Sequence, residues 1–163
     1  MADAEAITWK VRKATEDDLD EIVRVINAAY RVEDFFVKGN RTSVDEMRGR
    51  MASPGAAILV IDDENGLAAA VLVEIENARG HFAMLSVDPP LQGRGLARIL
   101  MDAIADFCRE AGCVGLDLEV VNLREDLPSF YDAFGFKPAG TAPFNAPEKL
   151  TREAHLVRMS KTL

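Results

Sequence analysis

The residues with the clearest chemical potential form a glycine turn at positions 92–97, Gln-Gly-Arg-Gly-Leu-Ala. The turn follows a short apolar run that stops at Pro89-Pro90, and a strongly periodic segment comes after it. Where a strand enters a glycine turn that opens a helix, backbone N–H groups converge and the helix dipole adds positive potential. The sequence therefore predicts an anion site suited to a phosphate group.

Two common phosphate-binding motifs do not fit this turn. The chain contains no G-x-x-x-x-G-K-[ST] segment, which excludes a Walker A loop. Gly93 and Gly95 form G-x-G, but a dinucleotide-binding fingerprint places a third small residue three positions after Gly95, where Arg98 stands. At this point a tight structural turn without a ligand is the alternative.

Hydrophobic periodicity and turn residues predict the elements that position the glycine turn. Four helices are expected, over residues 15–31, 44–51, 96–111 and 128–134. Seven strands are expected, over residues 8–13, 56–61, 67–75, 81–87, 114–121, 136–139 and 155–160. The predicted order is β-α-α-β-β-β-α-β-α-β-β.

This order predicts a mixed α/β (α+β) fold with one central mixed sheet. Short turns, including Asn65-Gly66, join the three strands of residues 56–87 and imply an antiparallel meander. The helix that begins at Leu96 is a crossover between strands 81–87 and 114–121, which must then be parallel. A closing hairpin completes the sheet, and helices are expected on both of its faces.

Length and composition limit the classes of function. We expect one domain over residues 1–163. Lys and Arg number 19 against 27 Asp and Glu, a net charge of −8, which argues against a nucleic-acid partner. No apolar run approaches the ~20 residues of a membrane span, and the start of the chain lacks a signal-peptide pattern. We therefore expect a cytoplasmic protein without a membrane partner.

Three motifs together resemble the GNAT N-acetyltransferase superfamily. Residues 92–97 fit its pyrophosphate signature Q/R-x-x-G-x-G/A. Residues 85–89, Leu-Ser-Val-Asp-Pro, resemble the central strand that leads to this loop. Residues 130–136, Phe-Tyr-x-x-Phe-Gly-Phe, resemble its later (F/L)-Y-x-x-x-G-(F/Y) signature. The resemblance extends over residues 11–159, nearly the whole chain.

The resemblance implies direct, acetyl-CoA-dependent transfer of an acetyl group to a primary amine of a small molecule or peptide. Acetyl-CoA is then the cosubstrate, no metal is required, and the amine acceptor is unidentified. A homodimer is one option for the assembly. A catalytically idle acyl-CoA-binding regulatory module on the same fold is the alternative function.

In the family, the central strand carries a bulge and splays from its parallel neighbour, so that the pantetheine arm pairs with the freed backbone. The amide of Leu85 is the expected donor to the thioester carbonyl. Asn122 stands nine residues before Tyr131, where the family usually has seven. The cofactor-binding residues that the resemblance implies are Leu85, Ser86, Val87, Gln92, Gly93, Arg94, Gly95, Leu96, Ala97 and Asn122.

Two catalytic roles follow from the same resemblance. Tyr131 is the candidate acid for the leaving thiolate, and a packed aromatic is the alternative role for that side chain. His81, at the start of the central strand, is the candidate base, because an imidazole can accept a proton near neutral pH. An ordinary surface histidine is the alternative. Lesser candidates for the base are Glu74, Glu119 and His155.

The remaining assignments concern the acceptor and the cysteines. Residues 30–41 join the first two helices, where this family shapes the acceptor pocket, and they mix charged with aromatic side chains. An ordinary exposed loop is the alternative. Cys108 and Cys113 are expected to be reduced and too few for a zinc site. Neither is expected at the reaction centre, which disfavours a route through an acetyl-cysteine.

Overall fold

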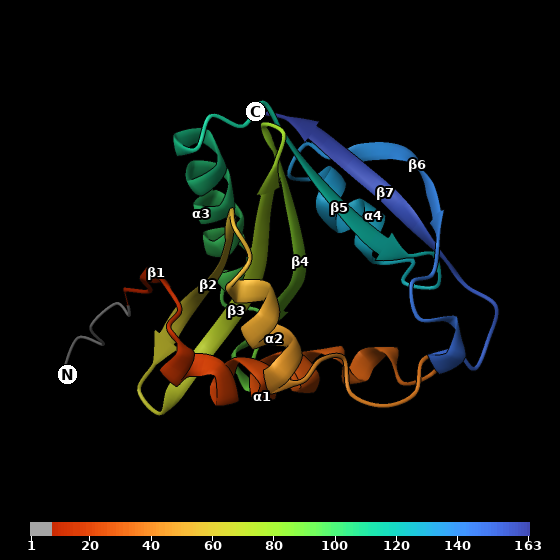
Figure 1. Ribbon diagram of the computed structural model, residues 1–163. Helices are drawn as coiled ribbons and strands as arrows, with labels where there is room; N and C mark the ends of the chain where they lie inside the picture. The colour runs from red at the N-terminus through yellow and green to blue at the C-terminus, as the bar shows by residue number, and fades with distance from the viewer. Residues whose placement is uncertain (1–7) are drawn as a thin grey trace, which may run out of the picture.

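The computed structural model describes residues 8–163, which form a seven-stranded mixed sheet with helices packed on it (Figure 1). The sheet order is β1-β2-β3-β4-β5-β7-β6. The strands are β1 (Val11–Lys13), β2 (Ala56–Asp63), β3 (Gly66–Glu76), β4 (Arg79–Val87), β5 (Gly115–Val121), β6 (Lys137–Pro143) and β7 (His155–Thr162). The α-helices are α1 (Leu19–Ala29), α2 (Val44–Met51), α3 (Leu96–Glu110) and α4 (Leu127–Asp132). Short 3-10 turns are η1 (Glu16–Asp18), η2 (Tyr30–Glu33), η3 (Pro89–Leu91) and η4 (Pro147–Lys149).

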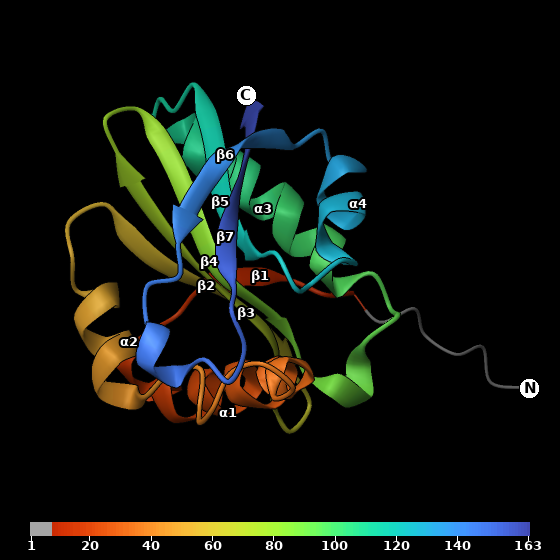
Figure 2. The same cartoon turned by 90° about the vertical axis from the view of Figure 1, so that its right-hand side faces the viewer.

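Two separate hydrophobic cores lie on the two faces of the sheet. One contains Leu100 and Ile104 of α3, Tyr131 of α4 and inward-facing residues of β2 to β5. The other contains Ile22 and Ile26 of α1 with residues from the opposite face of β2 and β3. The predicted fold class, with an antiparallel meander, a βαβ crossover and helices on both faces, is therefore confirmed (Figure 2).

Several boundaries differ from the sequence-based expectation. β1 begins only at Val11, because its ladder with β2 ends at the pair Val11–Ile61, beside a register shift. Asp18 binds back to the Thr15 backbone N–H, which closes η1, so that α1 starts at Leu19. The first hairpin turn is Glu64-Asn65, because Gly66 already belongs to β3. β6 is longer than expected and runs to Pro143.

The central strand β4 carries a bulge and pairs with β5 over a short stretch only. Leu72 of β3 pairs with Ala83, whereas Ala70 pairs with Ser86, so β4 has one residue more than β3 between these pairs. Met84 lies in this extra stretch with a φ of 57°, a conformation that is uncommon for a residue other than glycine.

The parallel ladder between β4 and β5 joins Arg79–His81 to Gly115–Asp117 and goes no further. Beyond it the two strands diverge (Figure 1). The bulge and the splay that the family resemblance implied are therefore confirmed. The edge of β4 that faces β5 is left without a ladder partner after His81, which opens the interior of the sheet.

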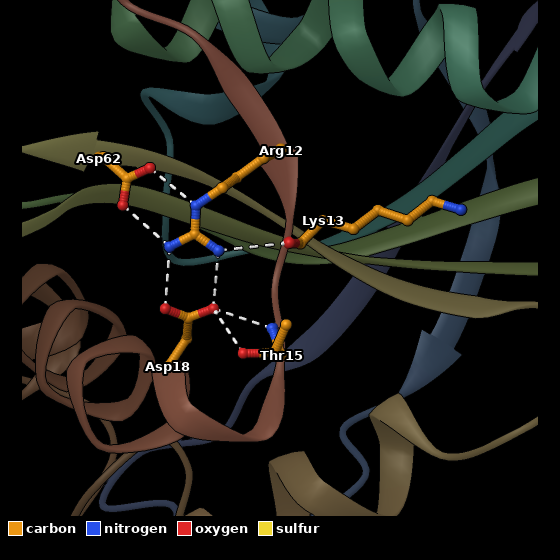
Figure 3. Close-up of polar contacts among 5 residues, drawn as sticks. All are labelled: Arg12, Lys13, Thr15, Asp18 and Asp62. Carbon is orange, nitrogen blue, oxygen red and sulfur yellow. Dashed lines mark hydrogen bonds and ion pairs between the residues drawn. The ribbon is translucent and has the colours of Figure 1, made fainter.

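A charged network ties the first strand to the rest of the fold (Figure 3). The Arg12 guanidinium donates from Nη1 and Nη2 to both oxygens of Asp18, at 2.8 and 2.9 Å. It also donates from Nε and Nη2 to both oxygens of Asp62, at 2.7 and 2.9 Å. Arg12 thus joins β1, η1 and the end of β2. The hydrogen bonds from Arg12 lower the pKa of Asp18 from 3.8 to about 2.

We expect Arg12→Gln to lower the free energy of unfolding at neutral pH by about 1 kcal/mol, the upper range for partly exposed pairs. The folded-state pKa of Asp18 lies below its unfolded value. This contribution is therefore complete above about pH 4 and is lost as the pH falls towards 2. Chemical denaturation across the acidic range measures both effects.

The matched control is Arg48→Gln, because Arg48 pairs with Glu16 and Asp45 on an exposed surface. This variant should change stability little. An Arg12→Gln protein that keeps the wild-type loss of stability between pH 4 and pH 2 would contradict the assignment.

Candidate active site

A cavity of about 620 Å³ lies where β4 and β5 separate. Its walls come from residues 81–85 of β4, residues 118–121 of β5, Tyr131 of α4 and two segments that follow α1 and β6. The cavity thus brings together His81, Tyr131 and much of the predicted acceptor segment 30–41. These residues are far apart in the sequence, and the bulged central strand is what places them around one space.

Tyr131 lies on the wall of the cavity with its ring packed in the core. Its ring contacts those of Phe82, Phe130 and Phe136, with centroids 5.0 to 6.0 Å apart, and the residue is 6% exposed. Burial raises the pKa of the Tyr131 hydroxyl well above its ordinary value of 10. The hydroxyl is therefore protonated throughout the neutral range and can only donate or share its proton there.

His81 lies on β4 at the point where the ladder with β5 ends. Its Nε2 atom is buried, lies 3.7 Å from Oε1 of Glu119, and has no hydrogen-bond partner within residues 8–163. A buried polar atom without a partner is costly, which is typical of atoms kept for a ligand or for chemistry. His81 also lines the cavity.

The other candidate bases are placed less favourably. Glu74 sits opposite His81 on β3, but its Oε1 accepts a hydrogen bond from Arg50 at 2.7 Å, and Glu74 does not line the cavity. Glu119 does line the cavity, beside His81. His155 is exposed at the start of β7, outside the residues that line the cavity.

The glycine turn opens α3 with both of its glycines in the left-handed conformation. Gly93 and Gly95 have φ angles of 83° and 82°, and Gly95 is the residue that caps the N-terminus of α3. Within the described chain, the backbone N–H groups of residues 93–98 have no backbone acceptor. A Cβ placed on either glycine would meet nothing within 4 Å, so the space beside both glycines is open.

The other expected cofactor residues contribute in different ways. The Ser86 hydroxyl is buried and donates to the Met84 carbonyl at 3.0 Å, and Ser86 pairs with Ala70 in the ladder between β3 and β4. The Gln92 side chain donates to the Val87 carbonyl at 3.2 Å and so ties the turn to the end of β4. Oδ1 of Asn122 accepts from the His155 backbone N–H at 2.8 Å, so this amide joins β5 to β7.

A buried ion pair links the acceptor segment to the residues before α4. Nη1 of Arg124 lies 2.9 Å from Oε2 of Glu33, and their side chains are 14% and 8% exposed. Burial raises the pKa of Glu33, although the charge of Arg124 opposes this shift. Arg124 also pairs with Asp126, at the start of α4. The segment 30–41 is therefore held against the helix that carries Tyr131.

Sequence reasoning did not single out Arg124. The residue lies within the stretch that makes the interval from Asn122 to Tyr131 two residues longer than usual, and that longer interval was the available signal. The pairing with Glu33 spans 91 positions of sequence, so no local pattern could have predicted it.

The two cysteines lie away from the cavity. Cys108 and Cys113 are both buried free thiols in the core around α3, and neither lines the cavity. Burial raises the pKa of Cys108 to about 12, which leaves almost no thiolate at neutral pH. Neither cysteine is placed to act as a nucleophile in the cavity.

Comparison with known proteins identifies the family. The model of the family described as acetyltransferase (GNAT) domain matches residues 20–162. The chain belongs to the GNAT superfamily of N-acetyltransferases. A mycothiol acetyltransferase of Propionibacterium freudenreichii subsp. shermanii is 32% identical over 153 residues, 89% of this chain and 48% of that protein. The chain thus spans about half the length of that relative.

Solved structures agree on the fold. A ribosomal-protein-alanine N-acetyltransferase from Brucella melitensis matches with a TM-score of 0.76 and 21% identity, over 94% of this chain and 99% of that one. Ard1 from Thermoplasma volcanium matches with a TM-score of 0.78 and 14% identity, over 96% of this chain and 99% of that one.

None of the helices in residues 8–163 is both long and apolar enough to cross a membrane. The relatives named as acetyltransferases give no support to an idle regulatory module.

Proposed function

We propose that this protein transfers an acetyl group from acetyl-CoA directly to a primary amine held in the cavity between β4 and β5. The observation that carries the proposal is the separation of these strands, since it puts His81 and Tyr131 on one cavity at the end of the strand that leads into the glycine turn. A cytoplasmic location and the option of a homodimer stay predictions from the sequence.

The residues of the turn and of β4 fit the cosubstrate. Within the described chain, the N–H groups of residues 93–98 have no backbone acceptor and lie at the positive end of a 15-residue helix, which suits a pyrophosphate. The unpaired edge of β4 after His81 suits the amide groups of a pantetheine arm, which bind as an added strand would. Leu85 N–H is the donor that we assign to the thioester carbonyl.

Acetyl-CoA, when bound, supplies the activated acyl group. The work of the chain is then to orient it, to hold the amine and to manage two protons. We assign the proton for the departing sulfur to the Tyr131 hydroxyl, because burial keeps this group protonated at neutral pH. We assign removal of the amine proton to Nε2 of His81, the buried atom without a partner.

The acceptor cannot be carried over from relatives. The curated relatives are named for mycothiol and, in a shorter match to a Streptomyces lavendulae protein, for streptothricin. Function within one fold is decided by the site and not by the fold itself. Part of the cavity wall here comes from two connecting segments, and such segments vary more among relatives than the elements they join.

The glycine turn can be tested with a matched pair of variants. Gly95→Val should lower the affinity for CoA by about tenfold or more, since a side chain would fill the space before the turn. Gly112→Val is the control, because Gly112 has nearly the same φ, 83°, and equally open surroundings at the other end of α3.

Both variants force a side chain into the left-handed region, at about 1–2 kcal/mol each. Calorimetric titration with CoA and denaturation of each variant separate the two effects. A folded Gly95→Val protein with the CoA affinity of the control would overturn the assignment of the turn.

The acid role and the activity itself can be tested together by following release of the CoA thiol against a panel of amines, antibiotics and peptides. Tyr131→Phe should lower kcat by on the order of 10²–10⁴ with little change in CoA affinity. The ring packing survives this change, so folding is not at issue. The chain has one other tyrosine, Tyr30, which also lines the cavity.

A larger loss of kcat in Tyr30→Phe than in Tyr131→Phe would show that Tyr131 is the wrong residue for the acid role. CoA binding without turnover of any amine would favour an idle binding module over the enzyme.

The base can be tested by comparing His81 with Glu74, the residue that pairs with it between β3 and β4. His81→Ala should lower kcat by about 10²-fold and leave CoA affinity unchanged. Glu74→Gln should have a smaller effect on kcat, because Arg50 already holds that carboxylate away from the cavity. The reverse ranking of the two variants would show that water passes the proton to Glu74 instead.

A further inference from the structure

The cavity has a charge opposite to that of the chain. Three carboxylate residues line it, namely Glu33, Glu46 and Glu119. Twice as many cationic residues line it, namely Arg31, Lys38, Arg41, Arg50, Lys149 and Arg158. The chain as a whole has a net charge of −8. A local excess of cations in an acidic protein calls for a reason beyond solubility.

Several of these charges are already neutralised by neighbours. Arg50 pairs with Glu74 at 2.7 Å and with Glu46 at 3.8 Å. Arg31 pairs with Asp34 at 3.9 Å. Glu33 is matched by Arg124, which does not line the cavity. Two of the three carboxylates, Glu33 and Glu46, and two of the six cations, Arg31 and Arg50, thus carry little net charge towards the cavity.

The remaining cations have no such partner. Among residues 8–163, no carboxylate lies within 4.0 Å of the charged nitrogens of the four cations that remain, namely Lys38, Arg41, Lys149 and Arg158. Arg158 stands opposite Glu119 in the ladder between β5 and β7, which offsets part of its charge. The surplus is therefore concentrated on Lys38, Arg41 and Lys149, which we name the basic rim.

The backbone builds this rim from two distant segments. Val37 forms an isolated antiparallel bridge with Leu150, and the Lys38 N–H donates to the Lys149 carbonyl at 2.8 Å. The segment after β6 thus lies beside the segment after α1 in both ribbon views (Figures 1 and 2). Because both segments line the cavity, the bridge bounds it on this side.

Arg41 is the member of the basic rim that lies beside an aromatic ring. It is half-buried, and its guanidinium lies 5.3 Å from the centroid of the Tyr30 ring. The π electrons of a nearby ring favour a guanidinium, and N–H groups directed away from the ring can bind a carboxylate with two hydrogen bonds. Arg41 is therefore suited to recognise a carboxylate rather than a diffuse negative charge.

The opposite wall has the complementary character. Among residues 8–163, no Lys or Arg nitrogen lies within 4.0 Å of the Glu119 carboxylate. Nε2 of His81 lies 3.7 Å from it, and both residues lie where β4 and β5 part. A primary amine suits this end, and a carboxylate suits the basic rim. A cavity of about 620 Å³ is the size of a small-molecule site, and the bridge between Val37 and Leu150 bounds it on one side.

We propose that the acceptor is a small molecule of the amino-acid class, which carries a free carboxylate together with the amine that is acetylated, and that Arg41 binds this carboxylate. This inference rests on the proposed function. A peptide with acidic side chains is the rival acceptor, and the experiment below includes it.

The test uses the full chain with acetyl-CoA and matched acceptor pairs, namely the common amino acids, their carboxamides and short acidic peptides. The ratio of kcat/KM for each acid to that for its carboxamide isolates the carboxylate. We expect a ratio of about ten or more for the preferred amino acid, since hydrogen bonds to charged groups are the strong ones. Arg41→Gln should bring this ratio close to one without changing the affinity for CoA.

Arg109→Gln is the matched control, because Arg109 is exposed on α3, pairs with Asp106 and does not line the cavity. It should leave the ratio as in the wild type. Equal rates for acid and carboxamide, a preference for peptides, or an equal loss for both acceptors in Arg41→Gln would overturn the inference while leaving the proposed function intact.

Calorimetric binding of the same pairs to the CoA complex gives a readout that does not depend on turnover. Preferential binding of the acid, abolished in Arg41→Gln, without acetylation of any amine would support the inference about the ligand and overturn the proposed function. Absence of any preference in binding as well as in turnover would overturn the inference.

Discussion

The arrangement of the whole site depends on a single irregularity in β4. In a regular sheet, a parallel neighbour would satisfy the edge of β4 along its full length and no space would remain between the strands. Here the extra residue around Met84 interrupts the ladder with β3, and pairing with β5 stops at His81. The positive φ of Met84 is a local cost that the two cores on either face must outweigh. The cavity, the free strand edge and the exposure of His81 to that space all follow.

The polar groups around the cavity differ in whether they have a partner within the protein. Among residues 8–163, Glu33 is the one charged residue that is buried, and it is paired with Arg124, because an isolated charge away from water is very costly. The exceptions are therefore informative. Nε2 of His81 has no partner in the described chain, and Arg41 rests on a ring instead of a carboxylate. Both exceptions lie on the same cavity.

How far the sequence could predict this structure depended on the range of the interactions. Periodicity and turn residues predicted the element order, and Gly95 and Gly112 were recognisable as the two ends of α3, because these signals are local. The bulge at Met84 was expected only through the family resemblance, since nothing in the neighbouring residues requires it. The pairing of Arg124 with Glu33 and the bridge from Val37 to Leu150 could not be predicted, because each joins segments about a hundred residues apart.

The brief ladder between β4 and β5 has a mechanical consequence. Three residue pairs form the ladder between the sheet's first four strands and its last three. The Arg79–Asp117 and Glu33–Arg124 ion pairs, the Val37–Leu150 bridge and apolar packing around α3, Tyr131 and Phe136 also join the two parts. Backbone ladders resist shear because each hydrogen bond is directional, whereas apolar contacts tolerate small rotations. The glycine turn and His81 belong to the first half and Tyr131 to the second. The relative position of His81 and Tyr131 therefore depends on the few contacts that cross this seam, because each residue is fixed to a different part of the sheet.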